Sequence, residues 1–313
     1  MADQRRQKHH TVPQFVLRNF ADCDGYIYEF DLDLLKVYRR KPAQVAHSTD
    51  FYTIDTEDGP SDGVEQVLSR IEDRASAVVR KLATPGTPLT CDDLDALVML
   101  VALQAQRVPA RREQMTSFID SVEELARRVA TSHGLDPDDA TAHLRGEMDF
   151  TRSGNFMNPF LLVSLDPVFR LMRRRGWAVV RRPEGAPRFI IADNPVVVTD
   201  LREETGPPYF PLIPYGEDSK LTMPISPDMT LVSYYEPKMS KEAYLPAELV
   251  GLCNHQQLRN ADRRLYGSGK DFNWGKLDDR VLWWNDFVVD QEEARAEQGW
   301  QPPHMRGPAA PTP

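Results

Sequence analysis

The spacing of hydrophobic residues changes near Trp177. Before that point, from about residue 64 to about residue 175, apolar side chains recur every three or four positions, which is typical of amphipathic helices. After it, short apolar runs are separated by proline, glycine and aspartate, which favours an antiparallel sheet. Because helices and strands occupy separate blocks, the sequence predicts an α+β fold rather than an alternating parallel sheet.

One predicted helix is apolar on nearly every side. Hydrophobic residues from Leu94 to Leu103 surround it, so we expect a buried central helix that Pro109 interrupts or kinks. The following helix carries one apolar stripe, formed by Met115, Phe118, Ile119, Val122, Leu125 and Val129. Further helices are expected near residues 64–82, 136–148, 158–175 and 246–265, and strands near 26–30, 36–39, 51–54, 177–180, 189–191, 196–198, 221–223 and 231–235.

The N-terminal segment joins two histidines to a run of apolar residues that begins at Val12 and ends at Phe20. A disordered leader would not carry that much apolar surface, so we expect His9 and His10 to enter the folded body with it. In an extended segment, adjacent side chains point to opposite sides. Only one histidine then needs to enter a pocket, and the two are a poor chelating pair.

The predicted elements form one α+β domain over residues 8–270. We expect N-terminal strands and a helical block packed with a mostly antiparallel sheet, followed by a C-terminal helix. Residues 271–300 are expected to be a C-terminal extension, which contains Trp283 and Trp284. Residues 301–313 are rich in proline and are expected to be a disordered tail.

Composition excludes several classes of protein. Lys and Arg number 38 and Asp and Glu 47, so the net charge of −9 gives no global attraction to phosphate backbones. No apolar run approaches the roughly 20 residues that span a bilayer, and no secretory signal is visible. Three widely spaced cysteines argue against a disulfide framework or a cysteine-based zinc site. We therefore expect a soluble, acidic, cytoplasmic protein. Nucleic acid would need a local basic patch, for example at Arg111-Arg112, Arg127-Arg128, Arg173-Arg174-Arg175 or Arg181-Arg182.

Two pairs of polar residues border the predicted helical core. Glu65 and Glu72 lie seven positions apart, on nearly the same helix face and at the edge of the apolar stripe. Gln104 and Arg107 project together from the end of the buried helix. A guanidinium there requires a carboxylate or an anionic ligand. Glu72 or Glu65 is the internal candidate, and a ligand carboxylate or phosphate is the external one.

Two further positions could belong to a site. Asp193 ends an apolar run, and Pro195, two residues on, has no N–H for the usual hydrogen bond of a turn aspartate. Asn254 and His255 lie within the late helix, where they face either the same cavity or solvent. The sequence shows no nucleophile elbow, no P-loop and no Rossmann glycine fingerprint, which disfavours those classes of enzyme.

Several separated motifs resemble the domain-of-unknown-function 4238 family, which is found mainly in microbes. The resemblance spans roughly residues 8–270 and implies an architecture but no mechanism. The motifs are His9-His10 with Pro13, Phe15, Leu17 and Phe20; Asp50 to Thr53; Glu65 and Glu72; Leu103 to Pro109; Ala192 to Val196; Pro224 to Pro227; and the helix with Asn254, Ala261 and Tyr266.

Two functional hypotheses follow from these residues. In the first, the protein is a hydrolase of the phosphodiesterase or nuclease type. His9 or His10 is then a general base or metal ligand, and Asp193 with Glu72 or Glu65 is a second base or hard-metal ligand. The anionic substrate is held by Arg107, Gln104, Asn254 and Glu65.

In the second hypothesis, the protein is a non-catalytic binding or interaction protein. Its polar residues form a salt-bridge and hydrogen-bond network, and Arg107 is paired by Glu72 or Glu65. Trp283 and Trp284 are then the exposed candidates for partner contact. The sequence leaves open a divalent metal, a small anionic ligand or nucleic acid as partner, and the oligomeric state.

Overall fold

The computed structural model describes residues 8–49, 52, 54–56, 59–61, 63–200, 219–234, 243–277 and 280–297. The helices are α1 (Gln14–Asn19), η1 (Pro42–Gln44, a 3-10 helix), α2 (Gly63–Leu82), α3 (Cys91–Arg107), α4 (Pro109–Ser132), α5 (Pro137–Arg152), α6 (Gly154–Arg173), α7 (Ala247–Asn260) and α8 (Trp284–Glu297). The strands are β1 (Lys8–His10), β2 (Ile27–Asp31), β3 (Lys36–Arg40), β4 (His47–Thr49), β5 (Ile54–Thr56), β6 (Gly59–Ser61), β7 (Gly176–Arg181), β8 (Ile191–Ala192), β9 (Val197–Asp200), β10 (Ser219–Ser226), β11 (Met229–Tyr234), β12 (Ala243–Tyr244), β13 (Arg264–Gly267), β14 (Asn273–Leu277) and β15 (Arg280–Trp283).

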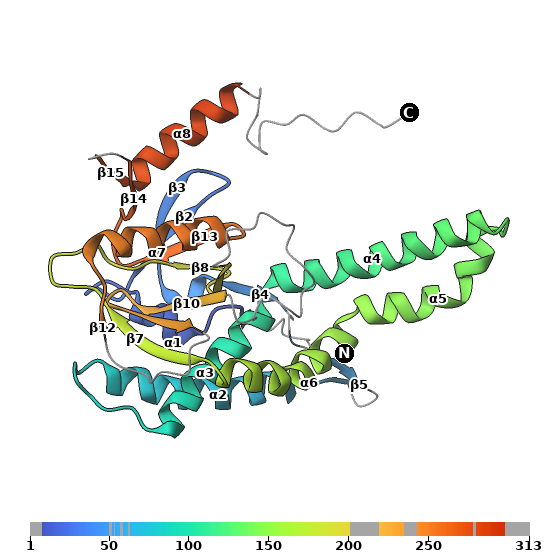
Figure 1. Ribbon diagram of the computed structural model, residues 1–313, viewed down its shortest axis with the longest axis horizontal. Helices are drawn as coiled ribbons and strands as arrows, with labels where there is room; N and C mark the ends of the chain where they lie inside the picture. The colour runs from blue at the N-terminus through green and yellow to red at the C-terminus, as the bar shows by residue number, and fades with distance from the viewer. Residues whose placement is uncertain are drawn as a thin grey trace.

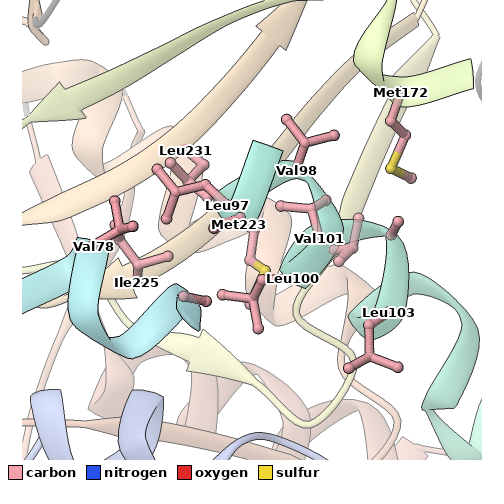
Figure 2. Close-up of a cluster of buried hydrophobic side chains, with 14 of the residues drawn as sticks. Val78, Leu97, Val98, Leu100, Val101, Leu103, Met172, Met223, Ile225 and Leu231 are labelled. Carbon is pink, nitrogen blue, oxygen red and sulfur yellow. The ribbon is translucent and has the colours of Figure 1, made fainter. Parts of the chain in front are cut away.

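Helix α3 is the centre of the main hydrophobic core, as its sequence predicts. It begins with a capping box, in which Thr90 accepts from the backbone N–H of Asp93 and Asp93 accepts from that of Thr90. Its apolar side chains pack against α2, α6 and strands β10 and β11 (Figure 2). The helix ends at Arg107, Val108 is extended, and Pro109 begins α4, so the chain bends where proline forbids a continuous helix.

One sheet has the strand order β12-β7-β11-β10-β9. The pairs β7–β11, β11–β10 and β10–β9 are antiparallel, and only β12 pairs in parallel. The predicted strands at 177–180, 196–198, 221–223 and 231–235 all contribute to it. Together with the helical block before it, this sheet confirms the predicted α+β fold (Figure 1).

A second sheet joins distant parts of the chain in the order β3-β2-β13-β8. Leu265 of β13 pairs with Phe30 on one side and with Ala192 on the other. The prediction of one helix from residue 246 to residue 265 is therefore wrong in its last turn. Helix α7 ends at Asn260 because Ala261 is extended and the following backbone N–H groups bond outside the helix.

Helices α4 and α5 form an antiparallel hairpin that projects from the body of the molecule (Figure 1). Ile119 and Ala130 are the buried residues of α4 and lie on one face of the helix. The hairpin follows directly from the bend at Pro109, so the same feature that ends the central helix also directs this arm outward.

The C-terminal segment packs on the second sheet. Trp284 is only 2% exposed and its ring lies 5.2 Å from that of Phe30, whereas Trp283 is 42% exposed. The expectation that Trp284 is exposed is therefore wrong, because Phe30, Phe272 and Phe287 surround its ring. The division into domain and extension stays a prediction, and the expected tail at 301–313 lies outside the described residues. No helix in the described part is long and apolar enough to cross a membrane.

Candidate functional site

The carbonyl oxygen of Thr11 is the meeting point of the N-terminal segment and the central helix. Gln104 donates to it from Nε2 at 2.8 Å, and Arg107 donates to it from Nε at 3.1 Å. The same Nε of Arg107 lies 2.9 Å from Oε1 of Gln104. Both side chains come from the last turn of α3 and are buried. The predicted pair does project together, and it holds a backbone group of the protein.

Arg107 forms an ion pair with Glu72 of α2, with Nη1 2.6 Å from Oε1. The arginine is 1% exposed, whereas the Glu72 side chain is 23% exposed. Burial lowers the pKa of Arg107, but the charge of Glu72 and the neighbouring Tyr52 and Glu65 outweigh it and leave that pKa raised. Within the described residues, nothing accepts a hydrogen bond from Nη2 of Arg107. Arg107 therefore stays charged, with one nitrogen not used by that part of the fold.

His9 lies beside Tyr52, the only described residue of the expected strand at 51–54 besides Ile54. Nδ1 of His9 accepts a hydrogen bond from the backbone N–H of Tyr52 at 2.9 Å, and the two rings are 5.4 Å apart. A neutral imidazole that accepts at Nδ1 carries its proton on Nε2. Nε2 is then a donor, so using it as a base or a metal ligand would cost His9 its bond to Tyr52.

The phenol of Tyr52 is buried between charged groups. Burial raises its pKa to about 12, while Arg107 and Arg112 act in the opposite direction and Glu65 and Glu72 add to the increase. At neutral pH this hydroxyl is therefore protonated. We define the junction cluster by the residues that meet here: His9, Tyr52, Glu65, Glu72, Gln104, Arg107 and Arg112.

Arg112, in the first turns of α4, extends the cluster toward α6. Its Nη2 donates to Oδ1 of Asn158, which is fully buried. Burial lowers the pKa of Arg112, and Tyr52 opposes the shift. His10 lies in a different environment, because it pairs with His47 across β1 and β4 with the rings 5.9 Å apart.

Asp193 binds the backbone at the start of β13. Its carboxylate accepts from the N–H groups of Asp262 at 2.8 Å and of Arg263 and Arg264 at 2.9 Å each. Burial raises the pKa of Asp193, although these three donors and the backbone N–H of Asn194 act to lower it. Pro195 cannot supply the usual turn donor, and donors about seventy residues later in the chain take that role.

Asp193 also affects its neighbour Asp262. Partial burial, the charge of Asp193 and that of Glu113 raise the pKa of Asp262 to about 6, against a backbone donor from Ala110 at the start of α4. The protonation of Asp262 is therefore coupled to the charge of Asp193, which follows β8, and to that of Glu113 in α4.

Asn254 is fully buried on α7 and uses its whole amide on the backbone. Oδ1 accepts from the N–H of Ile190 at 3.0 Å, and Nδ2 donates to the carbonyls of Arg188 at 2.9 Å and Asn273 at 2.7 Å. Gln257 and Asn260, at three-residue intervals, bind the backbone of residues 192–196 in the same manner. Side chains of α7 thus supply hydrogen-bond partners for the backbone N–H and C=O groups of the irregular segment before and after β8.

The predicted site residues thus fall into separate groups. His9, Glu65, Glu72, Gln104 and Arg107 belong to the junction cluster. Among the described residues, neither Asp193 nor Asn254 hydrogen-bonds to a member of it. No group of three His, Cys, Asp or Glu side chains in the described part could hold a metal ion. The catalytic and binding roles of all these residues stay predictions.

Sequence reasoning missed several members of these networks, namely Tyr52, Arg112, Asn158, Gln257 and Asn260. For Gln257 and Asn260 a signal was present, because Gln257 lies three positions after Asn254 and Asn260 three positions after Gln257, so that each lies beside the one before it on the helix. For Tyr52 and Asn158 the partners come from segments far away in the sequence, and local pattern carries no information about such pairs.

The fold and the junction cluster define an α+β protein in which buried polar side chains join an N-terminal segment to a central helix. The chain belongs to the family described as "Protein of unknown function (DUF4238)", which matches residues 8–271, so the resemblance seen in its motifs is confirmed. No curated protein and no solved structure matches the chain.

Proposed function

We propose that this chain is a non-catalytic binding or interaction protein whose buried polar residues hold its segments together. The observation that carries this proposal is the shared acceptor at Thr11, because Gln104 and Arg107 both donate to that backbone oxygen. The N–H groups of a side chain that binds a substrate are not ordinarily hydrogen-bonded to the protein's own backbone.

The other networks support the same proposal. Asn254 satisfies three backbone groups and Asp193 satisfies three more, while Arg107 is neutralised by Glu72. Buried polar groups that are satisfied in this way specify one arrangement of the chain. They account for acidic, basic and amide side chains at the border of the core without any reaction.

A double-mutant cycle on Arg107 and Glu72 tests this structural role. Either single change, Arg107→Met or Glu72→Met, leaves one charge without its partner and is expected to lower the free energy of unfolding by about 3 kcal/mol. The double variant should recover more than about 1 kcal/mol of the summed loss, because both charges are gone. Single variants as stable as the wild type would contradict the proposal.

A second candidate function is a hydrolase of the phosphodiesterase or nuclease type. One specific observation favours it: Nη2 of the fully buried Arg107 has no acceptor among the described residues. That nitrogen would donate to an anionic group of the substrate, as Gln104 and Asn254 were expected to do. Glu65 or Glu72 would be the general base, with Asp193 as a second one. His10, rather than His9, would accept a proton or bind a divalent metal, since Nδ1 of His9 is occupied.

Two measurements separate the candidates. The purified protein is assayed against an activated phosphodiester with and without Mg²⁺ or Mn²⁺, and its metal content is compared between the wild type and His10→Ala. Turnover that is lost in Arg107→Lys, or a transition metal that is lost in His10→Ala, would favour the hydrolase. Metal-free protein without turnover supports the binding protein.

A further inference from the structure

Three of the seven histidines of the chain lie in the small sheet formed by β1 and β4. His9 and His10 are on β1, and His47 is on β4, directly opposite His10 in the register of the two strands. The register contains three residue pairs, so few contacts hold β1 in place. Segments of this kind open locally at a small cost in free energy. Because imidazoles gain a charge near neutral pH, the attachment of β1 depends on groups that titrate in that range.

His9 contributes to this attachment in its neutral form. Its Nδ1 accepts a hydrogen bond from the backbone N–H of Tyr52 at 2.9 Å, and the residue is only 2% exposed. An imidazolium carries a proton on both nitrogens and accepts no hydrogen bond. Protonation of His9 would therefore replace the hydrogen bond by a repulsive contact between two N–H groups, and it would place a charge in a buried position.

The charged groups around Tyr52 do not offer the neighbouring imidazole an excess of negative charge. Arg107 of α3 and Arg112 of α4 act to lower the pKa of the Tyr52 phenol, whereas Glu65 and Glu72 of α2 act to raise it, so all of them lie near that ring. Their formal charges cancel, and Glu72 is already paired with Arg107. A proton on the imidazole would thus add positive charge to a balanced group.

On the other side of β1, His10 faces His47 across the two strands. The centroids of the two rings are 5.9 Å apart in an edge-to-face arrangement. Two neutral rings are compatible with this geometry, whereas like charges on directly opposite residues destabilise a pair of strands. Protonation of both rings therefore weakens the pairing of β1 with β4, and this effect adds to that of His9.

We propose that the sheet of β1 and β4 is a pH-sensitive switch, which is closed at neutral pH and opens when its three imidazoles take up protons. In the closed state, β1 is bound to β4 and to Tyr52. In the open state, β1 leaves both, and the edge of β4 becomes available for pairing. Thr11 follows β1 directly, and its carbonyl oxygen binds Gln104 and Arg107, so the switch adjoins the junction cluster.

This inference adds regulation to the proposed binding function and rests on it, because a metal ion on His10 would change how that ring titrates. Within the ranges that the structure describes, no three His, Cys, Asp or Glu side chains are placed to hold a metal ion. The experiments below are done in EDTA, which removes the metal that the hydrolase candidate would use.

Hydrogen exchange of the Tyr52 amide in the full chain, corrected for the intrinsic rate at each pH, tests the proposal. An imidazole of ordinary pKa, about 6.5, that must stay neutral in the closed state raises the open population about 30-fold between pH 7.5 and pH 5. We therefore expect the protection of the Tyr52 amide to fall by at least about 10-fold. The amide of Leu100, in the middle of α3, reports opening of the core and should not lose protection.

Two results of this measurement would overturn the proposal. One is a Tyr52 amide that is equally protected at both pH values. The other is an equal loss of protection at Tyr52 and Leu100, because the whole fold would then be opening. The proposed binding function is tested separately by the Arg107 and Glu72 cycle at a single pH, so either idea can fail without the other.

Variants assign the effect to the histidines. His9→Asn keeps an acceptor near the position of Nδ1 but does not titrate, and His47→Gln removes the partner of His10. In the double variant, the Tyr52 amide should be equally protected at pH 7.5 and pH 5. His133→Gln removes an exposed imidazole at the end of α4 and should keep the wild-type pH dependence. A pH dependence that persists in the double variant would overturn the proposal, and the wild-type measurement decides it if that variant does not fold.

Discussion

Gln104 donates its amide to the carbonyl oxygen of Thr11 at 2.8 Å, across 93 positions of sequence. Through this contact the last turn of the central helix is fixed to the segment that carries His9 and His10. Because the same amide oxygen lies 2.9 Å from Nε of Arg107, Gln104 also orients the buried guanidinium.

We expect Gln104→Leu to destabilise the fold although it keeps nearly the same volume. It removes one donor from Thr11 and one acceptor from Arg107, and leaving buried polar groups unsatisfied costs about 1–3 kcal/mol. Chemical denaturation measures the free energy of unfolding. Gln114→Leu, at an exposed position of α4 whose amide oxygen accepts from Arg111 at 3.1 Å, is the matched control and should cost under about 0.5 kcal/mol. Equal losses in the two variants would contradict this role of Gln104.

Asn254→Ala should be more costly than any other amide change on α7. Three backbone groups lose their partner at once, and each buried group left unpaired costs about 1–3 kcal/mol. Gln256→Ala is the control, since that side chain makes one hydrogen bond of 3.3 Å to Thr199. Thermal unfolding of both variants measures the difference, and an Asn254→Ala protein that melts like the wild type would show that these hydrogen bonds contribute little.

The pair Asp193 and Asp262 predicts a fall in stability as the pH rises through about 6. The pKa of Asp262 is raised from 3.8 to about 6 by partial burial and by Asp193. A group with a raised pKa in the folded state stabilises fully below its unfolded pKa, and this contribution is lost as pH rises through the folded pKa. Asp262→Asn should therefore flatten the decrease in unfolding free energy between about pH 4 and about pH 7.

Asp93 provides a control of opposite sign for this pH dependence. A hydrogen bond from Lys81 and the Thr90 cap lower its pKa to about 2, so its contribution is present above pH 3.8 and is lost as the pH falls toward 2. Asp93→Asn should reduce stability near neutral pH, whereas Asp262→Asn should increase it. The same sign for both variants would contradict the assignment.

The contact between His9 and Tyr52 predicts the tautomer of His9. When the imidazole is neutral, its single proton should reside on Nε2, because Nδ1 accepts a hydrogen bond from the backbone N–H of Tyr52. Nitrogen-15 chemical shifts of the imidazole distinguish the two forms. His47, on the β4 strand that pairs with β1, provides a second imidazole whose chemical shifts can be compared with those of His9. A proton found on Nδ1 of His9 would show that the hydrogen bond is not made in solution.

The sequence predicts those parts of the fold that depend on local pattern. The continuous apolar surface of residues 94–103 correctly indicates a buried helix, and Pro109 correctly indicates its interruption. The sequence predicts Leu265 in a helix because its apolar spacing continues that of α7, and this prediction is wrong. Its pairing with Phe30 and Ala192 depends on residues far away, and the three donors that Asp193 binds cannot be recognised from either segment alone.

In the candidate site, too, some features can be predicted from residue type and local pattern, whereas others depend on distant residues. The pairing of Arg107 with a carboxylate follows from the cost of burying a charge, and the sequence predicts either Glu72 or Glu65 as the partner; the structure has Glu72. The acceptor at Thr11 is a backbone carbonyl oxygen, which every residue has, so the sequence does not indicate it. Asn254 could be recognised as unusual, but only the position of Arg188, Ile190 and Asn273 makes it a structural residue.

The position of β13 between β2 and β8 affects how the chain is made. The second sheet cannot close until residues 264–267 have left the ribosome, although β2 emerges more than two hundred residues earlier. At typical rates of synthesis this interval lasts roughly 10 to 50 s. During that time the strand edges that β13 will occupy are open to other chains, so the newborn protein is vulnerable to aggregation until β13 is in place.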